Sequence, residues 1–199
     1  MARMSEGTVL RLRAAVADPV IVERYWSHVR VPSEPGCWLW TGAISGKGHG
    51  RFQIADDYIP TTTGRPTRQT FVVIAHRFGY ALRYSVDALL AVPIVAHRCD
   101  NPLCQNPVCW RESNHRANGR EFALRRDEVR GSLADQRGAR GRARAVRDAS
   151  VTVTGRAGPA STPPPCRRAA RFPAIDRAPA EMSAHHWPDR SRSERSRQQ

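Results

Sequence analysis

The chain has 199 residues, which is enough for one domain of ordinary size with some residues to spare. Its formal net charge of +14 favours a polyanionic partner, although a preference for arginine codons in the genome accounts for the charge equally well. No apolar run is long enough to span a bilayer, and residues 1–6 lack the pattern of a signal peptide, so we expect a cytoplasmic protein and no membrane partner.

The large apolar residues are unevenly distributed along the chain. Nearly all of the Trp, Tyr, Phe and Ile residues lie in the first 125 residues, and the remainder is rich in Arg, Ala, Pro, Ser and Gly. Only the first part can bury enough apolar surface to offset the conformational entropy of folding. We therefore predict an N-terminal extension over residues 1–21, a folded domain over residues 22–126, and a disordered Arg- and Pro-rich tail over residues 127–199.

The first predicted elements are two helices and a hairpin. Residues 7–17 have a helical pattern, and a second short helix follows Pro19, because proline is well tolerated in a first helical turn. Residues 37–43 are short and aromatic, as a strand should be, and residues 51–54 alternate in polarity. We expect these two strands to form a hairpin across the glycine-rich turn between them.

The elements that follow bring one histidine to the end of a strand. The apolar residues 89–97 end in a strand whose last residue is His97. A polar loop with Asn-Pro turn signals comes next, and Ser113 or Asn114 caps a helix that runs to about residue 126. N-terminal to residue 89 we predict a loop over residues 56–66, a strand over residues 69–74 and a helix over residues 75–84.

Four of the five cysteines lie in the part of the chain that we expect to fold: Cys37, Cys99, Cys104 and Cys109. In a reducing compartment, cysteines are interpreted as metal ligands before disulfides. Three of them lie in one turn-rich polar loop, which gives no packing reason to bury three free thiols. Four thiolates form a usual structural zinc site, and such a site stabilises a loop that has no core of its own.

His97 and Asn118 flank this cysteine loop. A neutral imidazole suits a general base near pH 7, and an amide oxygen suits a hard ion such as Mg²⁺. Hydrolysis of a phosphodiester needs both a base and a cation. By themselves, however, one histidine and one asparagine form a weak signal, because a lone histidine is more often a packing or surface residue.

Residues 96–118, which read AHRCDNPLCQNPVCWRESNHRAN, resemble the HNH motif of the His-Me finger endonucleases. They are most similar to the variant shared with the His-Cys box homing endonucleases. Three upstream segments, at residues 37–42, 48–52 and 75–80, resemble segments of phage and bacterial HNH proteins in the same order. The resemblance covers roughly residues 22–125 and nothing beyond them.

The resemblance implies an α+β fold built on a ββα-metal finger, with helices and a β-hairpin before it. It implies an HNH endonuclease that hydrolyses the phosphodiester bonds of double-stranded DNA and leaves 5′-phosphate and 3′-hydroxyl ends. The setting would be a bacterial or phage-infected cell. A homodimer is a further expectation, because the homing relatives dimerise to cut palindromic sites.

The same resemblance assigns roles to individual residues. The four cysteines match the ligands of a structural zinc ion. His97 matches the general base, and Asn118 matches the ligand of a single catalytic Mg²⁺. Asn106 matches the central asparagine, which orders the loop. Arg51 is a weaker candidate for a contact with the phosphate or the transition state.

Two positions depart from the family pattern. Cys109 stands where a histidine is usual, which is an acceptable exchange for zinc. Ala96 stands where many HNH enzymes have an aspartate that binds the metal, and His115 is one candidate to assist instead. The rival interpretations are a catalytically inactive, zinc-stabilised DNA-binding module, favoured by Ala96, and an RNA-binding or structural zinc protein.

Overall fold

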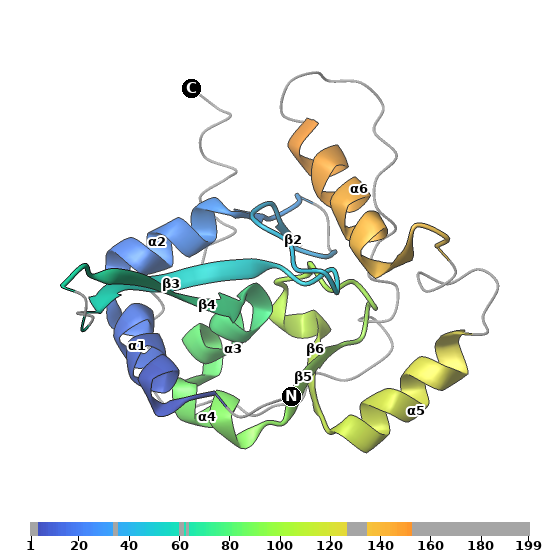
Figure 1. Ribbon diagram of the computed structural model, residues 1–199. Helices are drawn as coiled ribbons and strands as arrows, with labels where there is room; N and C mark the ends of the chain where they lie inside the picture. Colours follow the sequence, from blue (N-terminus) through green and yellow to red (C-terminus); the bar gives the residue numbers. More distant parts are fainter. Residues whose placement is uncertain (1–3, 34–35, 60–61, 63, 127–134, 153–199) are drawn as a thin grey trace, which may run out of the picture.

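The computed structural model describes residues 4–33, 36–59, 62, 64–126 and 135–152. Figure 1 shows a mixed α+β architecture, in which helices surround three two-stranded antiparallel sheets. This confirms the predicted α+β class. No helix in this part of the chain is long and apolar enough to cross a membrane.

Two helices open the fold, as predicted. Helix α1 spans Glu6–Ala17, and helix α2 spans Pro19–Ser27, with Pro19 in its first turn. The Asp18 carboxylate caps α2 by accepting a hydrogen bond of 2.8 Å from the Val20 N–H. Leu12 and Ala15 of α1 are buried in the main core, so the segment predicted as an extension contributes to that core.

The predicted hairpin between residues 37–43 and 51–54 is confirmed only at its turn end, where the Arg51 N–H donates to the Ala43 carbonyl at 2.8 Å. Strand β2 (Leu39–Trp40) pairs with β1 (Val29–Arg30), and one isolated bridge from Ile44 to Gly50 joins the two segments. The other edge of β2 faces the cysteine loop, where the Trp40 N–H donates to the Leu103 carbonyl at 3.0 Å. Both edges of this short strand are therefore occupied, and β3 has to find another partner.

That partner is β4. Strand β3 (Arg51–Ile59) and strand β4 (Thr67–Ile74) form the longest hairpin, with a register shift between Gln53 and Ala55. The loop predicted over residues 56–66 is therefore too long, because β3 continues to residue 59. Asp56 and Asp57 form ion pairs with Arg68 and Arg11, which lets these charged residues occupy an exposed strand.

Helix α3 (Ala75–Tyr84) carries the centre of the aromatic core. Phe78 is fully buried, and its ring lies 5.1 Å from the ring of Tyr25 and 4.7 Å from that of Phe52. A Cβ at Gly79 would lie 2.3 Å from the Tyr25 hydroxyl and 2.8 Å from the Trp110 ring, so glycine permits this close packing. Helix α4 (Val86–Ala91) follows and leads into the next strand.

The last sheet and helix contain the predicted strand, loop and helix, and a second strand that the residue pattern did not predict lies between the loop and the helix. Strand β5 (Ile94–His97) pairs with β6 (Trp110–Ser113), and the loop between them includes the 3₁₀ turn η1 (Pro107–Cys109). Helix α5 (His115–Arg126) follows, and the Asn114 side chain accepts a 2.9 Å hydrogen bond from the Ala117 N–H. Asn114 is therefore the cap of α5.

The tail is not entirely without structure, contrary to the prediction. Helix α6 (Gly138–Thr152) lies beside β2 in Figure 1, and its Ala143 is 2% exposed. Alanine and arginine are strong helix formers, and a Cβ at Gly48 would lie 2.6 Å from the Ala139 carbonyl oxygen, so glycine permits the close approach of this helix. The rest of the predicted tail, residues 127–134 and 153–199, lies outside the described residues.

Candidate metal centre and active site

The fold brings the remote Cys37 to the three cysteines of the loop. The Sγ atoms of Cys37, Cys99, Cys104 and Cys109 all lie within 4.8 Å of one another. A tetrahedral ion with Zn–S bonds of about 2.3 Å separates its sulfur ligands by about 3.8 Å, so the four thiols suit such an ion. The predicted cysteine cluster is confirmed as a group that can hold a metal ion such as zinc.

Backbone hydrogen bonds hold the two cysteine-bearing segments together. The Gln105 N–H donates to the Trp38 carbonyl at 2.7 Å, and Leu39 and Cys104 form an antiparallel bridge. Asn106 donates from its amide nitrogen to the Gly36 carbonyl at 2.6 Å and accepts from the Val108 N–H at 3.0 Å. These contacts order the loop, which is the role expected of Asn106.

The protonation of the cysteines gives a chemical reason for a cation in this cluster. Burial raises the pKa of the Cys104 thiol well above its ordinary value. Deprotonation of several neighbouring thiols is also unfavourable, because the negative charges of adjacent thiolates repel one another. A divalent cation reverses this preference, because it binds thiolates and neutralises their charge. The Asn106 N–H, at 3.4 Å from Sγ of Cys104, favours the thiolate further.

His97 is tied directly to this loop. Its Nε2 atom lies 3.0 Å from the carbonyl oxygen of Cys104, and the Trp110 indole N–H donates to the same oxygen at 3.2 Å. Since a carbonyl oxygen only accepts, Nε2 of His97 carries the hydrogen and Nδ1 keeps a free lone pair. Burial lowers the pKa of His97 below its ordinary value, so the ring is neutral at pH 7.

Two further histidines form a row with His97, which the sequence analysis did not predict. The His76 ring stands edge-on to the His97 ring at 4.5 Å, and the His49 ring lies 5.6 Å from that of His76. His76 is buried, and its Nδ1 atom has no hydrogen-bond partner. The spacing of helical residues gives no signal for this contact, because His76 and His97 come from different elements.

Asn118 lies on the first half of α5, and one ion pair sets the rotation of that helix. Glu121 of α5 forms an ion pair with Arg111 of β6, and Arg111 is paired in register with Ala96 of β5. Residues three apart share a helix face, so Asn118 lies on the same side of α5 as Glu121. This places Asn118 on the face that is turned to the strands.

Arg51 is the first residue of β3 and is exposed. It lines a cavity of about 330 Å³ together with Lys47 and His49. Arg51 therefore lies on the side of the molecule where the row of histidines begins.

Helix α6 adds a residue to the surroundings of the metal cluster. The Arg142 side chain donates to the Asp100 carbonyl at 3.0 Å, inside the cysteine loop. Burial lowers the pKa of Arg142, and the charges of Asp135, Cys99 and Asp100 oppose that shift. The arginine-rich composition of residues 138–144 suggested only a solvated tail, so this contact could not be predicted from the sequence.

Comparison with known proteins gives one partial similarity. The chain is 35% identical over 86 residues to "Protein 2.8" of Escherichia phage T7, a name that states no activity. The matched region covers 43% of this chain and 47% of the phage protein, so the chain spans about half the length of that relative. No protein-family model matches the chain, and no solved structure matches it.

Proposed function

We propose that this protein is a metal-dependent DNA endonuclease with His97 as its general base. The observation that carries this proposal is the hydrogen bond from Nε2 of His97 to the Cys104 carbonyl. This hydrogen bond orients the imidazole ring against the cysteine loop, which bound zinc would stabilise. It also leaves Nδ1 available to accept a proton. The resemblance of residues 96–118 to the HNH motif points in the same direction. The phage relative fits a phage-infected cell.

The proposed reaction is the hydrolysis of a phosphodiester bond. Nδ1 of His97 accepts a proton from a water molecule as the water oxygen attacks phosphorus. The bond from phosphorus to the 3′ oxygen breaks, and that oxygen takes up a proton from solvent. The products carry a 5′-phosphate and a 3′-hydroxyl group. The neutral form of His97 is the form that this step requires.

Two ions belong to the proposal. The four cysteines would hold a structural zinc ion that does not touch the substrate. The side-chain oxygen of Asn118 would bind Mg²⁺, which supplies charge neutralisation at the phosphate and the leaving oxygen. Ala96, 6% exposed and opposite Arg111, offers no second ligand, so water molecules and the phosphate would complete the coordination.

The direct test uses supercoiled plasmid and full-length protein purified with its zinc. We expect nicked or linear product with Mg²⁺, and none when Mg²⁺ is omitted; omission is preferable to EDTA, which also competes for zinc. The His97→Ala variant should lose activity while it keeps its zinc content. Added imidazole should partly restore its rate, because a free base can replace a missing one but cannot replace a structural contact.

The rival proposal is a zinc-stabilised module that binds DNA without cutting it, and Ala96 is the observation that favours it. Under that proposal the wild-type protein retards duplex DNA in a gel but produces no nicks with Mg²⁺ or Mn²⁺. Preference for single-stranded RNA over duplex DNA in a competition assay would support the third interpretation, an RNA-binding zinc protein.

A further inference from the structure

Arg77, in the first turn of α3, is a half-buried cation without a counter-ion. Neither an ion pair nor a hydrogen bond joins its guanidinium to any group of the protein in the described part of the chain. Burial alone lowers its pKa, with no acidic neighbour to oppose that shift. Placing a charge away from water without a partner costs free energy, so Arg77 in this position lowers the stability of the fold.

Other arginines of the domain have acidic partners. Arg11 is paired with Asp57, Arg13 with Asp87, Arg68 with Asp56, and Arg111 with Glu121. Arg111 and Arg11 are buried to a comparable degree, and each has a carboxylate. These four ion-paired arginines contrast with Arg77, which has no counter-ion among the described residues.

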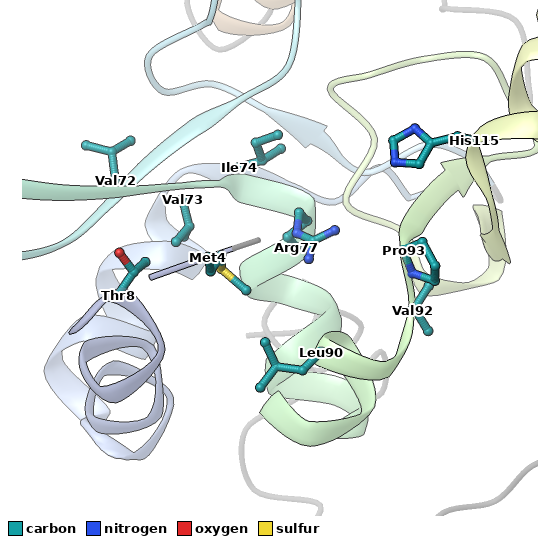
Figure 2. Close-up of a pocket in the computed structure, with 10 residues that line it drawn as sticks. All are labelled: Met4, Thr8, Val72, Val73, Ile74, Arg77, Leu90, Val92, Pro93 and His115. Atoms are coloured by element: carbon teal, nitrogen blue, oxygen red, sulfur yellow. The ribbon is translucent and has the colours of Figure 1, made fainter. Parts of the chain in front are cut away.

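Arg77 lines a cavity of about 500 Å³, shown in Figure 2. In this view its guanidinium lies between the β4 side chain of Ile74 and the pair formed by Pro93 and His115. No acidic residue is among the described residues that line the cavity. Its walls are largely apolar, which strengthens the attraction between the guanidinium and an anion. The remaining lining residues are Met4, Thr8, Val72, Val73, Leu90 and Val92.

The cavity adjoins the smaller one that contains Arg51. Both are lined by residues 72–74 of β4, so they lie along the same strand. The smaller cavity adds Lys47 and Arg51, and the described residues that line it include no acidic side chain. Lys47 and Arg51 likewise have no ion pair in the described part of the chain. Lys47, Arg51 and Arg77 thus each line a cavity that is bounded by residues 72–74 of β4.

We propose that the Arg77 cavity is a phosphate-binding site that anchors the backbone of duplex DNA, with Lys47 and Arg51 contacting the phosphates that follow. The planar guanidinium suits bidentate binding of a phosphodiester. A row of cations suits a chain of phosphates better than a single small anion. The inference rests on the proposed function for the identity of the polyanion, and it assigns Arg77 to binding rather than to the chemical step.

The test measures binding without cleavage, in the His97→Ala background and without Mg²⁺. A fluorescent DNA duplex is titrated with the His97→Ala protein at several salt concentrations. The titration is repeated with three double variants that add Arg77→Met, Arg77→Lys or Arg83→Met to this background. Arg83 is the matched control, because it lies on the same helix, is exposed, and carries the same charge. Zinc content and the unfolding midpoint show that each variant is folded.

Loss of a phosphate contact has a defined signature. Arg77→Met should weaken duplex binding by about 10-fold and lower the slope of log K against log salt by about one. Arg77→Lys, which keeps the charge, should recover part of the affinity, and Arg83→Met should lose clearly less than Arg77→Met. Equal losses in Arg77→Met and Arg83→Met would overturn the inference, because only net charge would then matter.

A second titration separates a DNA anchor from a pocket for a free anion. Inorganic phosphate should compete with the duplex only at millimolar concentrations. If inorganic phosphate binds tightly to Arg77 while Arg77→Met leaves duplex binding unchanged, the backbone assignment is overturned. Plasmid nicking by the single Arg77→Met variant is scored separately. A protein that never nicks but loses DNA affinity through Arg77→Met would refute the proposed nuclease and leave the phosphate site intact.

Discussion

Nε2 of His97 donates a 3.0 Å hydrogen bond to the backbone carbonyl of Cys104, and this contact joins the candidate metal centre to the candidate base. Cys104 is also one of the two cysteines of this cluster, with Cys109, that are fully buried. A change in the cysteine loop therefore changes the position of the imidazole ring.

Loss of one loop cysteine should release the metal and unfold the loop. We expect wild-type protein to bind one zinc ion per chain, measured by elemental analysis, and Cys104→Ser to bind much less. A structural zinc site contributes about 10–16 kcal/mol in small domains, so the unfolding temperature should fall sharply. The matched control is Cys166→Ser, a cysteine outside the described residues. Zinc-free wild-type protein with an unchanged unfolding temperature would contradict the assignment.

Asn118 should control the metal dependence of cleavage but not the zinc content. Asn118→Ala should require a higher Mg²⁺ concentration for half-maximal plasmid nicking, because an oxygen ligand is lost. Asn118→Asp should keep or lower that concentration, since a carboxylate replaces the amide. If both variants nick with the wild-type Mg²⁺ dependence, Asn118 is not a ligand.

His76 should act through the orientation of His97. The His76→Ala variant leaves space beside the His97 ring, and misplacement of a reacting group by about 1 Å can lower a rate by about 100-fold. His76→Phe fills most of that space, so it should recover much of the nicking rate with an unchanged Mg²⁺ dependence. A rate for His76→Ala within twofold of wild type would show that the contact has no effect on catalysis.

Arg142 should couple helix α6 to the cysteine loop. Arg142→Met removes the hydrogen bond to the Asp100 carbonyl, and we expect a loss of about 1–3 kcal/mol in the free energy of unfolding. The rate of zinc release to a chelator should rise as well. Arg144→Met, an exposed arginine of the same helix, should change neither quantity. Equal behaviour of the two variants would mean that α6 does not support the loop.

Stability should fall as the pH drops from about 6.5 to 4. Burial lowers the pKa of His49 from 6.5 to about 4, so in this range the unfolded chain binds a proton that the folded chain does not. The free energy of unfolding then decreases by about 1.4 kcal/mol per pH unit for this group. The pKa of His76 is lowered as well, mainly by burial, and acts in the same direction.

Urea unfolding between pH 4.5 and 6.5 measures this slope. The His49→Asn variant should show a slope smaller by about 1.4 kcal/mol per pH unit than that of the wild type. Zinc content is measured at each pH, because acid also releases metal from thiolates. An identical slope in the two proteins, with zinc retained, would show that His49 does not titrate as described.

The sequence by itself determined the local elements and the members of the metal cluster. Helical periodicity and Pro19 located α1, α2 and α3, and the polar loop with three evenly spaced cysteines indicated a metal site. A helix cap at Ser113 or Asn114, and His97 at the end of a strand, were also predictable. These features depend on neighbours along the chain, so short-range chemistry is enough to predict them.

Only the tertiary structure decided which distant groups meet. It paired β2 with β1 and with the cysteine loop, so β3 pairs with β4. It placed His76 against His97, joined α6 to the cysteine loop through Arg142, and left Arg77 without a counter-ion among the described residues. Each of these contacts depends on which partner a group finds in the folded chain: a strand edge needs another strand, a buried charge needs a counter-charge, and an apolar face needs an apolar surface. Three-dimensional packing decides which partner is available, and the periodicity of the sequence carries no information about it.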